Sequence, residues 1–170
     1  MQNGSLIDLE PRKAYVMANS RHSPKDLKAS LRVQAFIKSW ERLRLTRYFD
    51  QGGKPTIGWG HLLDHELFDV IDLKKAEALF RDDLQHAAET VRRLVKVDLW
   101  QSEFDALVSL VWNIGREPFR KSTMLKLLNK ADYRGASDEF IRWRFVDGVE
   151  SKGLLRRRQA ERQFFNTVPF

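Results

Sequence analysis

The chain contains no cysteine among its 170 residues. This absence excludes disulfides, thiol nucleophiles and cysteine-ligated zinc. Four histidines remain, at positions 22, 61, 65 and 86. His65-Glu66 begins like the helix motif of zinc proteases, but Asp69 stands where the second histidine would be. The sequence therefore predicts no metal site.

Long apolar runs are also lacking, and none approaches the ~20 residues of a membrane span. The beginning of the sequence has no apolar stretch of signal-peptide length, the longest candidate being residues 14–18. We therefore expect no stable membrane anchor and no export signal. The stretch Met17-Ala18-Asn19-Ser20 also looks like a natural start of translation. In that interpretation residues 1–16 are upstream readthrough or a remnant of cloning.

What the sequence has is positive charge, with a formal net value of +7. Such a balance favours an anionic partner: nucleic acid, lipid headgroups or an acidic cell-wall polymer. The basic residues are scattered, and no nucleic-acid-binding motif is present. Charge alone does not choose among these partners, but nucleic acid is the least expected.

Hydrophobic spacing predicts one domain in an α+β, mainly α, class. Residues 1–29 read as a weakly ordered lead-in, and 30–170 as the folded domain. A helix is expected after Ser30, ending near Glu41, and residues 46–62 read as a small antiparallel hairpin or meander. Further elements are predicted as an amphipathic helix at 73–96, an apolar helix ending near Asn113 with Gly115 as C-cap, and shorter helices near 122–130, 135–143 and 153–165. Asp98 with Gln101 resembles a capping box for the apolar helix. The expected architecture is a small sheet near the N-terminus packed beside a helical body.

Three polar residues, Glu41, Asp50 and Thr56, follow one another with the spacing Glu-x8-Asp-x5-Thr. Glu41 lies near the C-terminal end of a predicted helix, where the helix dipole disfavours a carboxylate. A protonated carboxyl is what a general acid needs. Asp50 on the first strand could face Glu41 across a groove, and two carboxyls flanking a bond is the usual glycosidase arrangement. Solvated surface carboxylates remain the alternative on spacing alone.

Strand alternation sorts the second predicted strand into two faces. Thr56, Gly58 and Gly60 point one way, where a sugar could approach a hydroxyl and bare backbone. Residues 57, 59 and 61 point the other way, which makes His61 a packing residue. On the long helix, Asp83 lies at the edge of the apolar stripe, so we expect it to pair with His61.

Two stretches, Trp40-Glu41-Arg42-Leu43-Arg44-Leu45 through Asp50, and Thr56-Ile57-Gly58-Trp59-Gly60-His61, resemble the phage lysozyme (endolysin) family. An ordered series of further matching positions extends the resemblance over about residues 30–165. The resemblance implies inverting hydrolysis of the β-1,4 bond between N-acetylmuramic acid and N-acetylglucosamine in peptidoglycan, with no cofactor. It makes Glu41 the general acid, while Asp50 and Thr56 hold and activate water.

The resemblance also implies supporting residues. Gly58, Gly60, Trp112, Asn113 and Ser122 are expected to bind substrate, although core packing is an equal alternative for Trp112. His61, Asp83 and Arg157 are expected as structural support. Arg157 belongs to the run Arg156-Arg157-Arg158, for which a solvated face or a membrane-disrupting basic helix are alternatives to pairing with Glu41.

The sequence departs from the family where Arg42 replaces a glycine after the acid and Trp59 replaces a tyrosine. If position 42 needs a left-handed backbone, arginine costs about 1 kcal/mol there; exposure to solvent is the simpler interpretation.

We expect a monomer. Family membership would place the enzyme in the host cytoplasm until its release through the inner membrane, after which it would act in the periplasm and cell wall. Alternatives are a lytic transglycosylase, a lysozyme-like effector or bacteriocin domain, and a basic nucleic-acid-binding module.

Overall fold

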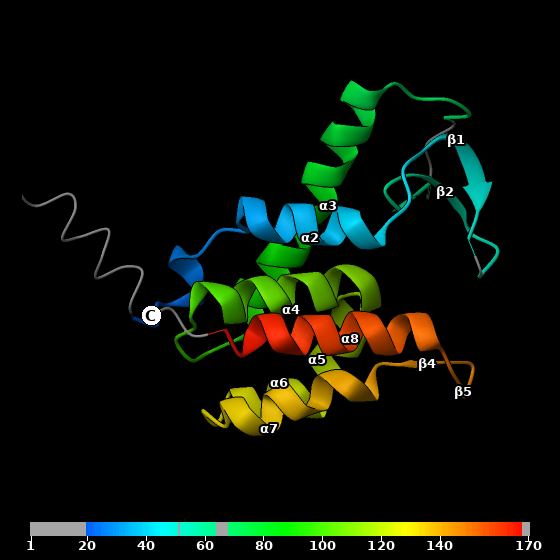
Figure 1. Cartoon of the computed structure of the whole chain (residues 1–170). Coiled ribbons are helices and arrows are strands. Elements are labelled where there is room, and N and C mark those ends of the chain that lie inside the picture. Colours follow the sequence, from blue (N-terminus) through cyan, green and yellow to red (C-terminus); the bar gives the residue numbers. More distant parts are fainter. Residues whose placement is uncertain (1–19, 51, 64–67, 168–170) are drawn as a thin grey trace, which may run out of the picture.

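The computed structural model describes residues 20–50, 52–63 and 68–167. The expectations for residues 1–19, and the His65-Glu66 pattern, lie outside these described residues. The architecture is a small antiparallel sheet packed beside a helical body, which confirms the predicted fold class (Figure 1).

The sheet has three strands in the order β1-β2-β3, namely β1 (Arg44–Phe49), β2 (Pro55–Gly58) and β3 (His61–Leu62). In the register Tyr48 pairs with Thr56, and Ile57 pairs with His61. The meander predicted over residues 46–62 is therefore confirmed. One end of β1 is irregular between Arg44 and Tyr48.

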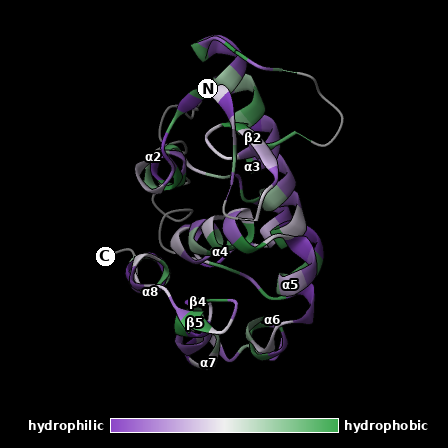
Figure 2. Ribbon diagram, turned by 90° about the vertical axis from the view of Figure 1, so that its right-hand side faces the viewer, coloured by the Kyte–Doolittle hydropathy of each residue, from purple (hydrophilic) through white to green (hydrophobic). Residues whose placement is uncertain are grey.

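The helical body surrounds α4 (Gln101–Ile114), which is buried along most of its length. Figure 2 shows α4 in the middle of the molecule, and it contacts α2 (Leu31–Trp40), α3 (Leu73–Leu94), α5 (Arg116–Lys121) and α8 (Lys152–Phe165). The remaining helical elements are η2 (Pro24–Asp26), α6 (Thr123–Leu128), α7 (Tyr133–Asp138) and η3 (Glu139–Arg142). An apolar helix can be buried on all sides only when other helices cover it, as they do here.

Two helix starts illustrate how the sequence specifies local structure. The helix α2 begins directly after Ser30 as predicted, and Ser30 caps it, because its hydroxyl accepts the backbone N–H of Val33 at 3.2 Å. The capping box proposed for Asp98 and Gln101 is wrong, since α4 begins one residue after Trp100. Glu103 accepts the backbone N–H of Trp100 at 2.8 Å, which is the helix-side half of such a box shifted by two residues.

Other differences concern short elements. Residues 116–121 form a separate helix, α5, directly after Gly115, whose φ of 83° fits the predicted C-cap role. A small hairpin of β4 (Phe145–Val146) and β5 (Val149–Glu150) lies where we expected no strand. Its turn is Asp147-Gly148, both at positive φ, and Asp-Gly is a strong hairpin signal that could have revealed it.

Residues 20–29, expected to be part of a weakly ordered lead-in, instead pack on the helical body. His22 exchanges backbone hydrogen bonds with Leu99, and Leu27 is buried in the core. The Arg21 guanidinium binds the carboxylate of Glu103 at 2.7 Å and lies 3.6 Å from the centre of the Tyr133 ring. These contacts attach the segment before α2 to the body.

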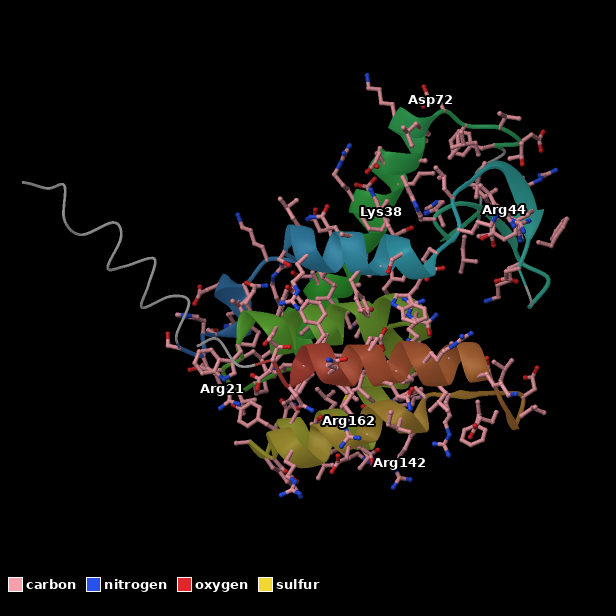
Figure 3. All side chains as sticks on the ribbon, viewed as in Figure 1. Arg21, Lys38, Arg44, Asp72, Arg142 and Arg162 are labelled. Carbon is pink, nitrogen blue, oxygen red and sulfur yellow. The ribbon has the colours of Figure 1, made fainter. Side chains whose placement is uncertain are left out.

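The sheet side and the body are joined by α3, the longest helix, which runs from the sheet into the body (Figure 1). Lys38 of α2 binds Glu77 of α3 at 2.7 Å, and its ammonium lies 4.2 Å from the centre of the Trp59 ring (Figure 3). Trp59 in turn packs edge-on against Phe80 of α3. The sheet is thus fixed to the body through α2 and α3. Among the described residues, none of the helices has both the length and the apolarity needed to cross a bilayer.

Candidate active site

Glu41 occupies the C-cap position of α2, where its backbone N–H still bonds to Ile37. Its side chain is 23% exposed, and its Oε1 accepts a hydrogen bond from Nη1 of Arg157 at 2.6 Å. Arg157 comes from α8 and is itself buried. The predicted pairing of this arginine with Glu41 is therefore present in the structure.

Arg157 is held in turn by a buried cluster around Glu161, one turn further along α8. The Glu161 carboxylate accepts hydrogen bonds from Arg157, Arg158 and the hydroxyl of Ser109, at 3.2, 3.0 and 2.7 Å. Burial lowers the pKa of Arg158 to about 10 and raises the pKa of Glu161 above its usual range. Two of the three arginines in the basic run are thus buried, so the solvated-face interpretation holds only for Arg156.

This Glu161 cluster leaves several hydrogen-bonding atoms unsatisfied. Arg158 Nε lies 2.9 Å from Glu161 Oε2, but the two are not aligned for a hydrogen bond. Arg158 Nη1 and Arg157 Nη2 are also buried without a hydrogen-bond partner among the described residues. Burying such groups without partners destabilises the folded state. The cluster therefore places one cation beside Glu41 at the expense of stability.

Asp50 and Thr56 are positioned differently, by the turn between β1 and β2. Asp50 Oδ1 accepts the backbone N–H groups of Gly52 and Lys54 at 2.9 and 2.8 Å. The Thr56 hydroxyl donates to the carbonyl oxygen of Lys54 at 3.0 Å. Because a hydroxyl has one proton and two lone pairs, this bond leaves Thr56 as an acceptor.

The three predicted residues share one groove of about 480 Å³. Gly60 also lines it, and with φ at +93° it brings bare backbone beside the acid: a Cβ here would lie 3.8 Å from Glu41 Oε2. The complete lining is Glu41, Tyr48, Asp50, Gly52, Thr56, Gly60, Leu62, Trp112 and Asn113. The groove, referred to below as the central groove, thus brings together two carboxyls, a hydroxyl, an amide and two aromatic rings.

Comparison with known proteins agrees with this geometry. The phage lysozyme family model matches residues 38–161. An endolysin of Acyrthosiphon pisum secondary endosymbiont phage 1 is 42% identical over 136 residues, which cover 78% of this chain and 93% of the relative. The chain belongs to the phage lysozyme family. It is accordingly a glycoside hydrolase of the endolysin (muramidase) type, as the sequence predicts.

Further relatives of this phage lysozyme point the same way. The endolysin of Salmonella phage P22 is 39% identical over 134 residues, covering 76% of this chain and 91% of the relative. Among solved structures, the muramidase domain of SpmX from Asticaccaulis excentricus superposes with a TM-score of 0.75 at 34% identity, covering 83% of this chain and 99% of that domain. The endolysin of Escherichia coli O157:H7 phage FAHEc1 gives a TM-score of 0.74 at 31% identity, with coverages of 86% and 96%.

The supporting pair His61 and Asp83 is also in contact. His61 Nδ1 lies 2.8 Å from Asp83 Oδ2, which links β3 to α3. The predicted contact is therefore present, but residues 59 and 60 form a turn between β2 and β3, so the strand alternation used to predict it does not run unbroken to His61.

Two of the expected substrate-binding residues do not reach the central groove. Gly58 faces α3, since a Cβ placed on it would meet Ala76 and Ile71 at 3.9 Å. The Ser122 hydroxyl caps α6 by accepting the N–H of Leu125 and donating to the carbonyl of Phe119. Gly60, Trp112 and Asn113 do line the groove. Tyr48 lines it as well and was not among the expected residues; burial, together with the charge of Glu41, raises the pKa of its phenol.

The two departures from the family pattern have simple structural contexts. Arg42 is exposed and is not among the described residues with positive φ, so its backbone carries no left-handed strain. Trp59 is buried against Phe80, as a packing variant should be.

Proposed function

We propose that this phage lysozyme hydrolyses the β-1,4 bond between N-acetylmuramic acid and N-acetylglucosamine with inversion, using Glu41 as the general acid. The observation that carries the proposal is the central groove, in which Glu41, Asp50 and Thr56 line a single cleft. Glu41 would protonate the leaving oxygen. No cofactor takes part in this chemistry.

The second half of the mechanism assigns the attacking water to Asp50 and Thr56. Asp50 is oriented through Oδ1, and among the described residues no group donates to its Oδ2. Thr56 offers hydroxyl lone pairs beside it. Two acceptors can hold a water by its two protons and withdraw one of them, and an inverting glycosidase needs this water on the face opposite the acid.

Replacement of the acid tests the proposal. Glu41→Gln keeps the shape but cannot donate the proton, so turnover of peptidoglycan should fall by about 10²–10⁴-fold. A zymogram and a cell-wall turbidity assay measure it, with Glu117→Gln on exposed α5 as a matched control. Near-parent activity in Glu41→Gln would reject the acid assignment.

The products separate inversion from its alternatives. Hydrolysis should give reducing ends whose first-formed anomer is inverted, as read by NMR, whereas a lytic transglycosylase would give anhydro ends. Asp50→Asn keeps an oxygen that can accept the turn hydrogen bonds but removes the base, so it should lower hydrolysis without unfolding the turn.

For the biological setting, we propose host cell lysis by a monomer that stays in the host cytoplasm until the inner membrane is breached, and then acts on the cell wall. Family membership supports this setting. Cells that express the protein together with a holin should lyse, and cells that express it without a holin should stay intact. Lysis without a holin would contradict the proposed setting. A lysozyme-like effector or bacteriocin domain would instead be found without lysis genes beside it.

A further inference from the structure

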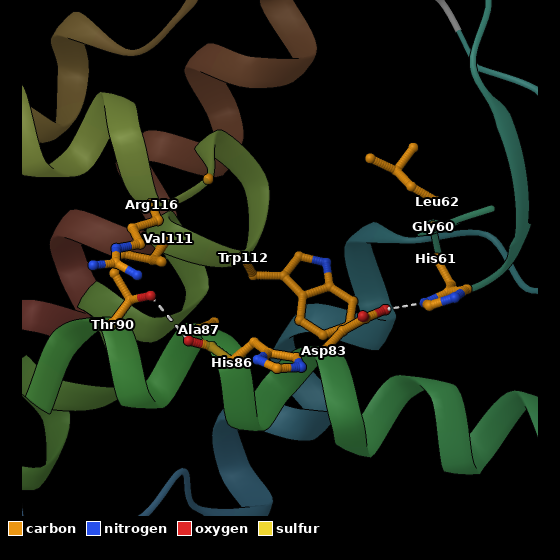
Figure 4. A pocket seen from close by; sticks show the side chains of 11 residues that line it. Gly60, His61, Leu62, Asp83, His86, Ala87, Thr90, Val111, Trp112 and Arg116 are labelled. Carbon is orange, nitrogen blue, oxygen red and sulfur yellow. Dashed lines mark hydrogen bonds and ion pairs between the residues drawn. The ribbon is translucent and has the colours of Figure 1, made fainter. Parts of the chain in front are cut away.

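A second groove adjoins the central groove on the far side of Trp112. This outer groove has a volume of about 360 Å³ and shares Gly60, Leu62 and Trp112 with the central groove. Its remaining walls come from His61 of β3, from α3, from Val111 of α4 and from the start of α5 (Figure 4). Because three residues line both spaces, a ligand in the central groove can continue past Trp112 into the outer one.

The outer groove has an aromatic ring near its middle and two basic side chains, Arg116 and His86, in its walls. Figure 4 shows the indole of Trp112 between Leu62 on the sheet and Arg116 at the start of α5, with His86 of α3 below it. His86 and Arg116 are exposed. Among the described residues, neither the His86 ring nor the Arg116 guanidinium makes a hydrogen bond or an ion pair. The nearest carboxylate in the sequence, Glu117, is bound by Arg120.

The acidic residue of the outer groove already has a hydrogen-bond partner. Asp83 lines it but pairs with His61 at 2.8 Å. The Thr90 hydroxyl donates its only proton to the backbone oxygen of His86 at 3.0 Å. The groove thus offers Arg116 and His86 as donors to an anion, with no unpaired acid among its described residues to repel one.

We propose that the outer groove binds the peptide stem of the substrate, with Arg116 and His86 holding a stem carboxylate. The proposal rests on the proposed function. The glycan itself does not supply this charge, because the lactyl carboxyl of muramic acid is consumed in its amide bond to the stem. The stem carries free carboxylates, and an arginine fork binds a carboxylate well.

The test compares two forms of one substrate. Glycan strands whose uncrosslinked stems keep their free carboxylates, called strands with stems, are assayed beside the same strands after the stem carboxyls have been converted to amides, called amidated strands. Both substrates keep the lactyl carboxyl in its amide bond. Arg116→Gln should raise KM about two- to five-fold on strands with stems, the range expected for one exposed ion pair, and leave kcat unchanged. On amidated strands Arg116→Gln should match the parent. His86→Gln should act in the same direction with a smaller change.

The control is Arg134→Gln, which removes the same charge from exposed α7, away from both grooves. It should leave KM unchanged on both substrates. An equal rise in KM on both substrates for Arg116→Gln would show that Arg116 acts on the glycan or the fold, and would overturn the proposal. So would an unchanged KM on strands with stems.

Failure of the proposed function would look different. If the parent releases no reducing ends from strands with stems, the muramidase assignment itself fails. If the parent is active and only the stem dependence is missing, the outer groove is assigned wrongly and the muramidase assignment stands.

Discussion

The two halves of the active site are held in different ways. Asp50 and Thr56 are positioned by backbone groups within four residues of them. Glu41 is positioned from far along the chain, by an arginine 116 residues away. Local bonds can place a side chain on a turn, whereas placing a carboxyl across a cleft from that turn requires the helical body.

The helix that carries Glu41 is tied to the body at both ends. At its start, Ser30 donates to the buried carboxyl of Asp105 through its backbone N–H at 3.1 Å and its hydroxyl at 2.5 Å. At its end, Arg157 binds Glu41 itself. The polar contact that fixes the sheet, between His61 and Asp83, is less buried. Substitutions in the helical body should therefore disturb Glu41, and substitutions in the sheet should disturb Asp50 and Thr56.

The largest expected effect comes from the Glu161 cluster. Glu161→Leu leaves Arg158 buried without its partner, which should cost about 3–5 kcal/mol of unfolding free energy. Chemical denaturation measures it. The exposed neighbour on the same helix, Gln159→Leu, is the control and should change stability little. A loss below about 1 kcal/mol would mean that Glu161 is not the counter-ion of this cluster.

A smaller effect is expected on the sheet side. His61→Asn breaks the partly exposed pair with Asp83 and should cost about 1 kcal/mol. The groups lining the central groove remain, so activity at low temperature should persist. Asp82→Asn, on an exposed neighbour of Asp83, serves as control. If activity falls as far as it does in Glu41→Gln, His61 has a chemical role instead.

The hydrogen bonds between Ser30 and Asp105 at the start of α2 should make the stability of the protein depend on pH. Burial raises the pKa of Asp105 above its ordinary 3.8, against the opposing hydrogen bonds from Ser30. A raised folded-state pKa means that the folded protein binds this proton more tightly than the unfolded chain. Its contribution to stability is then complete below pH 3.8 and is lost as the pH rises through the raised pKa.

Asp105→Asn removes this titration. The stability of the variant relative to the parent should therefore improve as the pH rises from acid towards neutral, as measured by unfolding at a series of pH values. Asp98→Asn, on the exposed segment before α4, should leave the pH dependence unchanged. A variant that follows the parent curve in parallel would show that Asp105 does not contribute to it.

The smallest effect is expected at Arg42. This side chain is exposed and its φ is not positive, so restoring the family's glycine with Arg42→Gly relieves no strain. Stability should change by no more than about 1 kcal/mol, the backbone entropy cost of glycine, and activity should stay near the parent. A large gain in turnover would show that the Arg42 charge had been disturbing Glu41.

The sequence could predict what depends on short-range pattern. The structure contains the predicted helix start after Ser30, the predicted C-cap at Gly115 and the predicted contact between His61 and Asp83. Asp50 and Thr56 could be placed in the same way, because they lie on either side of one turn.

The failures have a common physical origin. Ser30 and Asp105 are 75 residues apart, and nothing in the spacing of either residue announces the bond between them. For the charge run at 156–158, only the family resemblance pointed to Arg157 as the partner of Glu41, because the burial of Arg157 and Arg158 depends on the packing of α8 on α4. Gly58 was assigned to the groove by strict alternation, but its φ of +68° takes the backbone out of the extended form on which alternation depends.

The contact between Glu41 and Arg157 has a consequence for the order of events during synthesis. The strand turn and the acid leave the ribosome long before α8 does, yet the cation beneath the acid arrives only with α8. A partly made chain therefore carries all three cleft residues without the arrangement that holds them. The active site is complete only when α8 has been made. A truncated product ending before Arg157 would contain Glu41, Asp50 and Thr56 but would lack the cation that holds Glu41 in place.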